Sequence, residues 1–150
     1  MKHAYSDLYL EDAMINLADA FDYAVNGCGL DIGYFMDLFI KSGYAKNFSI
    51  ANPTVVSGMS GIELVLHILD KMNIDNNTPD FNGNLELSEE YWVGWILAYY
   101  QWESGCSFDE IHEYLSMKTL RKLYHSLHEV SEKRAAMSIN NTINRNKGNQ

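Results

Sequence analysis

Cysteine, basic residues and long apolar runs are all scarce in this chain of 150 residues. Its two cysteines, Cys28 and Cys106, form no CxxC pair, so the sequence predicts neither a zinc site nor a disulfide framework. Such sparing use of cysteine is typical of a reduced compartment. No run of about 18 apolar residues occurs, as a membrane-spanning helix would need, and the first residues lack the apolar core of a signal peptide. We therefore expect a cytoplasmic protein with no membrane segment.

Basic residues are also unevenly placed along the chain. Lysine and arginine number 11 against 20 aspartates and glutamates, and the net charge is −9. Residues 1–117 hold 4 basic and 18 acidic side chains, whereas residues 118–150 hold 7 and 2. The first part should repel polyanions, while the late segment could attract them. The plainer interpretation is a late helix with a basic, solvated face.

Apolar residues are abundant, at 47% of the chain, and they predict a folded core in one domain. They recur at three- and four-residue steps, which predicts helices. We expect an all-α, single-domain, irregular bundle of about five to six helices around a buried aromatic central helix. This helical domain covers residues 1–138, and the Asn-rich residues 139–150 are expected to form a frayed or disordered tail. The expected helices cover residues 7–26, 31–42, 60–72, 88–104, 107–115 and 119–137.

Two segments between these helices are predicted to be connections. Residues 73–87 are rich in turn residues. Residues 44–59 are expected to form a loop, in which Pro53 keeps Asn52 out of the helical conformation. A capping box of Ser60 and Glu63 then begins the next helix. Free N–H groups at such a start can hold an anion, but no phosphate-binding Gly-Lys-Ser or Gly-Lys-Thr is present. A structural turn is therefore the favoured interpretation of Asn52, Pro53, Gly58, Ser60, Gly61 and Glu63.

The helix over residues 88–104 carries three tryptophans and three tyrosines within twelve residues. It is apolar nearly all round, which predicts a central, buried position. The alternative is that the aromatics wall a ligand pocket or anchor a partner, because Trp and Tyr are frequent interface hot spots. The candidate partner-binding residues are Tyr91, Trp92, Trp95, Tyr99 and Trp102.

Residues 107–130 allow a second functional interpretation. A short capped helix, a turn near Ser116 and a following helix that opens with basic residues resemble a helix-turn-helix. In that motif the second helix enters the major groove of DNA. The candidate DNA-binding residues are Lys118, Thr119, Arg121 and Lys122.

The histidines offer only a weak metal signal. His125 and His128 lie three residues apart, with Glu129 and Glu132 four residues beyond each of them. Metal sites in bundles need matching ligands from a second helix, and no such set is evident in the sequence. Exposed helix polarity is the favoured interpretation, and we expect neither a metal nor a cofactor. No catalytic constellation stands out, so we expect no enzymatic activity.

Three stretches of the sequence resemble a known family. They are Asp22–Asn26, the run from Ser42 through Asn52-Pro53 to Leu64, and Glu90–Trp102. The resemblance covers about residues 5–105 and is to a family of small, uncharacterised proteins of gut Firmicutes. Genes of that family lie beside genes for ADP-ribosyltransferase-like proteins, in an arrangement typical of toxin–antitoxin modules. The resemblance implies no catalytic residue.

Charge pattern and resemblance together lead to one expectation and two alternatives. We expect a non-enzymatic protein-binding component, antitoxin-like or accessory to a toxin–antitoxin or mobile-element module. Its acidic body would cover a basic surface of a protein partner, possibly a toxin, and its basic end would fold on binding. One alternative is a DNA-binding regulator that uses residues 107–130. The other is an acidic mimic of nucleic acid that inhibits a DNA- or RNA-binding enzyme.

Overall fold

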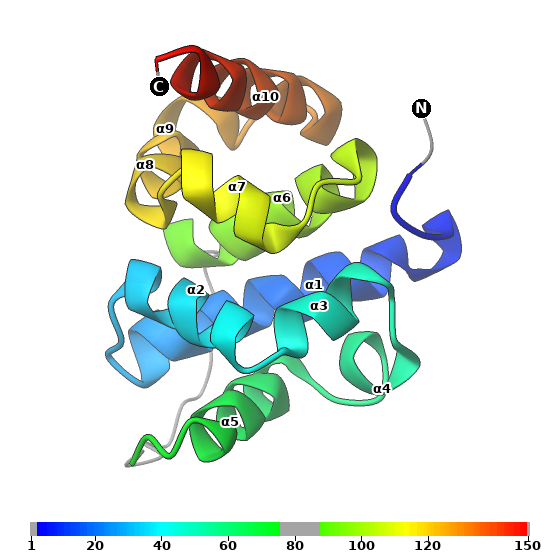
Figure 1. Cartoon of the computed structure of the whole chain (residues 1–150), viewed down its shortest axis with the longest axis vertical. Helices are drawn as coiled ribbons and strands as arrows, with labels where there is room; N and C mark the ends of the chain where they lie inside the picture. Colours follow the sequence, from blue (N-terminus) through cyan, green and yellow to red (C-terminus); the bar gives the residue numbers. More distant parts are fainter. Residues whose placement is uncertain (1–2, 76–87, 150) are drawn as a thin grey trace.

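The computed structural model of the chain describes residues 3–75 and 88–149, and all regular structure in these ranges is helical (Figure 1). This confirms the all-α class. The described residues form ten α-helices, more than the five to six expected, with a 3-10 helix at Asp7–Tyr9 and a π-helical turn at Tyr23–Gly27. The α-helices are α1 (Leu10–Asp22), α2 (Ile32–Lys41), α3 (Tyr44–Ser49), α4 (Pro53–Val56), α5 (Gly61–Lys71), α6 (Glu89–Ser104), α7 (Phe108–Tyr114), α8 (Met117–Lys122), α9 (Tyr124–Leu127) and α10 (Glu132–Gly148).

The additional helices come from two segments. The expected loop at residues 44–59 contains α3 and α4, which place Ala45, Phe48, Val55 and Val56 in the core. The expected long helix at residues 119–137 is divided into α8, α9 and the start of α10. Ser131 begins α10, because it has an extended backbone and its hydroxyl accepts a hydrogen bond from the Arg134 N–H. The turn-rich segment 73–87 falls mostly outside the described residues.

Helices α1 and α6 form the centre of the bundle and run antiparallel. The Ala4 N–H donates to the Trp102 carbonyl at one end, 2.9 Å away, and the Ser88 hydroxyl donates to Asp22 Oδ1 at the other, 2.7 Å away. Between these ends the two backbones are in contact at Gly94, where a Cβ atom would lie 2.7 Å from Ala18 Cα. In Figure 1, α5 lies on one side of this pair and α10 on the other.

The motif around Ser60 fastens α4 and α5 to α1. Both hydrogen bonds of the Ser60–Glu63 capping box are present, and Asn52 caps α4 through the Thr54 N–H. The Asn16 amide of α1 donates to the carbonyls of Val56 and Met59. A Cβ on Gly61 would lie 2.6 Å from the Ala20 nitrogen, so close packing against α1 requires glycine there. In this geometry the six motif residues hold the junction of three helices.

The expected tail is helical in the structure. Helix α10 extends to Gly148 and buries Ile139 and Ile143 against α6 and α7. Tyr100 donates to Asn140 across 2.8 Å, and the Asn146 amide donates to the Tyr114 carbonyl across 2.7 Å. The prediction of a frayed segment is therefore wrong for residues 139–148, because asparagine side chains supply hydrogen bonds to neighbouring helices while two isoleucines enter the core.

Candidate functional site

The partly exposed aromatic residues of α6 share one face of the helix. Tyr91, Trp95 and Tyr99 are four residues apart, so their side chains lie above one another. Each is half-buried, whereas Val93, Ile96 and other residues on the remaining faces are buried. We call Tyr91, Trp95 and Tyr99 the aromatic face. Helix α6 is therefore buried over most of its surface, as expected, but keeps one aromatic face in contact with solvent.

Two other aromatics of α6 turn inward, with 8% of each side chain exposed. Trp102 stacks on the His3 ring at a centroid distance of 3.7 Å, and its indole N–H donates to the Tyr5 carbonyl 2.8 Å away. Trp102 thus holds the first described residues against the end of α6. Trp92 makes an edge contact with Tyr124 of α9, at 5.9 Å between centroids. The five candidate partner-binding residues accordingly divide into a solvent-facing set and a packed pair.

A pocket of about 370 Å³ opens at one end of the aromatic face, between α6 and α9. Tyr124 and His128 stack at 4.2 Å on one side of it, and Tyr91 and Trp95 lie nearly parallel, with centroids 6.4 Å apart, on α6. We call this hollow the α6–α9 pocket; it is lined by Tyr91, Trp92, Trp95, Tyr124 and His128.

Carboxylates contact two of the residues that line the pocket. Glu132 accepts a hydrogen bond from the Trp95 indole N–H at 3.3 Å, and Glu129 lies 3.7 Å from the His128 ring nitrogen. Glu89, in the first turn of α6, lies 3.1 Å from His125 Nε2. Two of the pocket-lining residues thus contact a glutamate directly.

Further carboxylates border the aromatic face. The pKa of Tyr91 is raised, first by partial burial and then by the negative fields of Asp19 and Asp22 on α1. The pKa of Tyr99 is raised to about 12 by burial and by nearby Glu103 and Glu132. These carboxylates belong to α1, α6 and α10, so acidic groups from three helices lie near the aromatic face.

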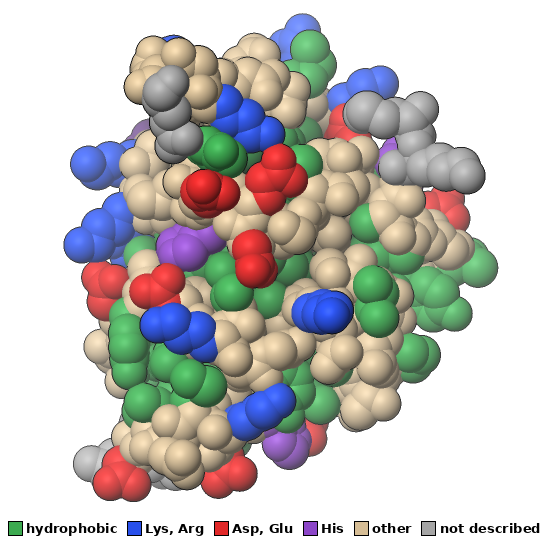
Figure 2. Space-filling view, viewed as in Figure 1, with side chains coloured by type: hydrophobic (Ala, Val, Ile, Leu, Met, Phe, Trp, Pro, Cys, Tyr) green, Lys and Arg blue, Asp and Glu red, His purple; other side chains and the backbone are tan. Residues whose placement is uncertain are grey.

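The candidate DNA-binding residues are mostly engaged with the acidic body. Arg121 pairs with Glu90 at 3.3 Å, and Lys118 lies 3.6 Å from Asp31. The Thr119 N–H and hydroxyl both bond to the Ser116 side chain, which caps α8. Lys122 is exposed. On the side of the molecule shown in Figure 2, basic side chains project from the edge where α8 lies, and acidic ones gather over α7.

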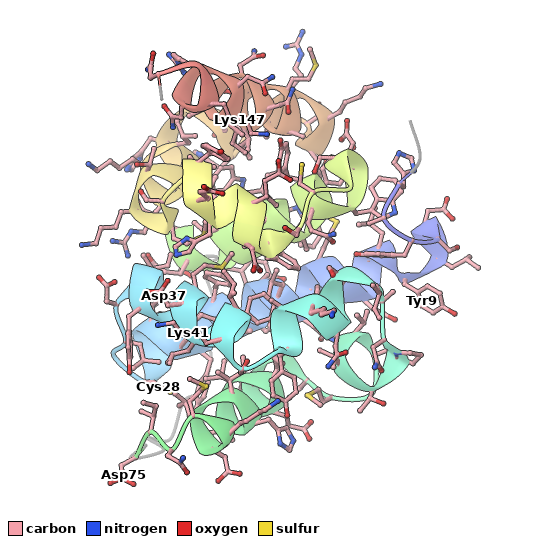
Figure 3. All side chains as sticks on the ribbon, in the orientation of Figure 1. Tyr9, Cys28, Asp37, Lys41, Asp75 and Lys147 are labelled. Carbon is pink, nitrogen blue, oxygen red and sulfur yellow. The ribbon has the colours of Figure 1, made fainter. Side chains whose placement is uncertain are left out.

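Helix α7 is itself tied to both of its neighbours by charged groups. Lys147 of α10 and Asp37 of α2 lie on either side of α7 (Figure 3). The Lys147 ammonium is 2.8 Å from Glu110, and the His112 ring is 2.8 Å from Asp37. The pKa of the Glu110 carboxyl is lowered, chiefly by the hydrogen bond from Lys147. The short helix that would be the first of a helix-turn-helix is therefore built into the bundle.

The His-x-x-His-Glu-x-x-Glu pattern does not converge on one point. His125 turns to Glu89, His128 stacks on Tyr124, and Glu132 bonds to Trp95. In the part of the chain that the structure describes, no cluster of three or more His, Cys, Asp or Glu side chains is arranged to hold a metal.

Tyr124 and His128 line the pocket, although the sequence indicated only exposed helix polarity for His128 and no role for Tyr124. Nothing in the sequence signals their approach to α6, because it depends on where α9 packs in the fold. Asp19 is only partly exposed, near Tyr91.

No protein-family model, curated protein or solved structure matches this chain. None of the helices in residues 3–75 and 88–149 is both long and apolar enough to cross a membrane.

Proposed function

We propose that this chain is a non-enzymatic protein-binding component that covers a basic surface of a protein partner. The observation that carries the proposal is the aromatic face of α6, which is half-buried and close to carboxylates, with Trp95 bonded to Glu132. Aromatic side chains give large contact area at low entropic cost and dominate interface energies. The nearby carboxylates favour a cationic partner and speed its encounter.

We infer the class of partner from the charge of the chain and from the family that its sequence resembles. A protein with net charge −9 is suited to neutralising a cationic protein. An antitoxin acts in this way when it covers the working surface of a toxin. We therefore place the chain in the antitoxin-like or accessory class, in keeping with its resemblance to proteins from toxin–antitoxin-like modules.

Protein binding is better supported than DNA binding by the contacts of α8. A recognition helix must present its first residues to bases and phosphates. Here α8 has six residues, and Arg121 and Lys118 pair with carboxylates of the body. Phosphate contact would require both cations to leave these partners.

The test is capture with the tagged full-length chain from its native cells at low salt, with protein and nucleic acid both analysed. The wild type is compared with a Trp95→Ala/Tyr99→Ala variant and with a Lys118→Glu/Lys122→Glu control. We expect that the wild type and the control capture one protein in stoichiometric amount, and that the aromatic variant does not capture it. Purified partner should then bind wild type directly, and thermal unfolding should show that the aromatic variant is folded.

Other outcomes would redirect or overturn the proposal. Specific DNA that is captured by the wild type and lost with the charge-reversal control would identify a DNA-binding regulator. A captured enzyme that DNA displaces from the chain would identify a mimic of nucleic acid. A protein partner retained equally by both variants would show that the aromatic face is not the binding surface.

A further inference from the structure

We propose that the α6–α9 pocket binds an organic cation, a substituted ammonium or guanidinium group. The site goes beyond the proposed function because it can be occupied by a free small molecule. The cation site depends on the proposed function in one case only, in which the cation is a side chain of the protein partner.

Aromatic rings form the walls of the pocket. Five side chains with aromatic rings line the pocket, and two of them, Tyr91 and Trp95, lie half-buried on the same face of α6. The face of an aromatic ring carries negative potential and attracts a cation within about 6 Å of its centroid, most strongly for Trp. Several rings around one hollow are the arrangement that recognises quaternary ammonium groups.

Negatively charged side chains lie beside two of these rings. Glu132 holds the Trp95 indole through its N–H, and Glu129 lies beside His128. Neither glutamate is paired with a lysine or arginine in the described structure, whereas Glu90 is paired with Arg121. A neutral apolar ligand would gain nothing from these carboxylates, but a cation would gain from both.

The size of the pocket suits a small ligand. A volume of about 370 Å³ is within the range of small-ligand pockets, and most of its lining is apolar. It admits a trimethylammonium or guanidinium group with its stem, and it is small for a folded partner segment. The rings are held by packing and by the Trp95–Glu132 hydrogen bond before any ligand arrives. Such preorganisation reduces the entropic cost of binding.

The test is a fluorescence titration of the full chain with choline and with its neutral isostere, 3,3-dimethyl-1-butanol. Trp92 and Trp95 both line the pocket, so occupancy should change their emission in a saturable way. We expect choline to bind at least about fivefold more tightly than the isostere, in line with cation–π energies. Equal binding of the two, or no saturable change with choline, would overturn the proposal.

Variants locate the binding and separate charge from shape. Trp95→Leu removes the best ring but leaves Trp92 as a reporter, and it should weaken choline binding about tenfold. Glu132→Gln keeps an acceptor for the indole N–H and removes the charge, so it should weaken choline binding a few-fold. Glu113→Gln removes an exposed glutamate from α7 outside the pocket and should leave choline affinity unchanged. Loss of binding with Glu113→Gln but not with Glu132→Gln would contradict the site.

A third titrant, Nα-acetyl-arginine amide, distinguishes the source of the cation. Tighter binding of this compound than of choline indicates an arginine of the protein partner, and the reverse order indicates a free small molecule. Failure here is distinguishable from failure of the proposed function. If choline does not bind while capture of the partner still depends on Trp95 and Tyr99, only the cation site is wrong. If choline binds and no partner is captured, only the protein-binding proposal is wrong.

Discussion

At the scale of single residues, glycine decides how closely the central helices approach. Gly94 of α6 faces the Leu17 carbonyl and Ala18 Cα of α1, and Gly61 of α5 faces the backbone of Asn16 and Ala20. Backbone atoms cannot move aside as a flexible side chain can. The structure shows that α1 is the helix that packs closely against α6 at Gly94.

Substitution of Gly94 by alanine should therefore destabilise the bundle, although alanine favours helix. The new methyl group would lie 2.7 Å from Ala18 Cα and against the Leu17 carbonyl. We expect a loss of about 3 kcal/mol or more in the free energy of unfolding, at the upper end of overpacking effects. Urea denaturation measures it. The matched control is Gly148→Ala, where nothing lies within 4 Å of the added atom, and a similar loss there would contradict the explanation.

Asp19 should oppose folding near neutral pH. Its pKa is raised, first by partial burial and then by the charge of Asp22. A raised pKa means that the folded state favours the protonated carboxyl, so this group's contribution to stability is lost as pH rises through the folded pKa. Asp19→Asn should therefore be more stable than the wild type at pH 7, by about 0.2–1 kcal/mol after solvent screening.

Thermal unfolding of Asp19→Asn and wild type at several pH values checks this sign. The difference between the two proteins should narrow as pH falls from 7 toward 4, because wild-type Asp19 then takes up its proton. A variant that is less stable at pH 7, or a difference that grows in acid, would show that the Asp19 charge is favourable in the fold.

At the scale of elements, the helices that follow Ser60, Ser88 and Ser107 were predictable, and the division of the last predicted helix was not. Ser60, Ser88 and Ser107 begin helices where the sequence predicted, since a cap acts on N–H groups two or three residues away. The division of residues 119–137 was missed because the apolar pattern continues through α8 and α9. The extended backbone at Ser131, whose hydroxyl caps α10, separates α10 from them.

Ile139 tests whether α10 is an integral part of the bundle. Its side chain is 1% exposed, among residues that the sequence assigned to a tail. Ile139→Ala should cost about 2–4 kcal/mol of unfolding free energy, as for other buried aliphatic residues. Met137→Ala, on the same helix at 59% exposure, should change it by less than about 0.5 kcal/mol. Equal and small effects at both positions would restore the interpretation as a frayed tail.

At the scale of the whole molecule, the basic late segment is folded back on the acidic body. Arg121 and Lys147 each lie within 4 Å of a carboxylate on an earlier helix, and Lys118 lies within 4 Å of Asp31, which caps α2. The sequence predicted a division of charge but not this pairing, since it depends on α8 and α10 reaching α2, α6 and α7. The segment expected to fold on binding a partner is helical in the structure, in α8 and α10.

This pairing predicts weak binding to nucleic acid. With a net charge of −9 and most of the basic residues of α8 engaged, the chain should not shift a DNA duplex in a gel at about 10 μM and low salt. A salt-sensitive shift that Lys118→Glu/Lys122→Glu abolishes would show that α8 contacts phosphates.

The sequence by itself determined the helical class, the helix starts at Ser60, Ser88 and Ser107, and the central place of α6. Each of these depends on interactions within a turn or two, or on an apolar pattern that the chain displays directly. Tertiary structure decided which three aromatics of α6 meet solvent, which carboxylates border them, and that Tyr124 and His128 close a pocket against Trp92. Those properties depend on where distant helices come to rest, because a side chain's exposure and the electric field on it are set by neighbours that no local pattern specifies.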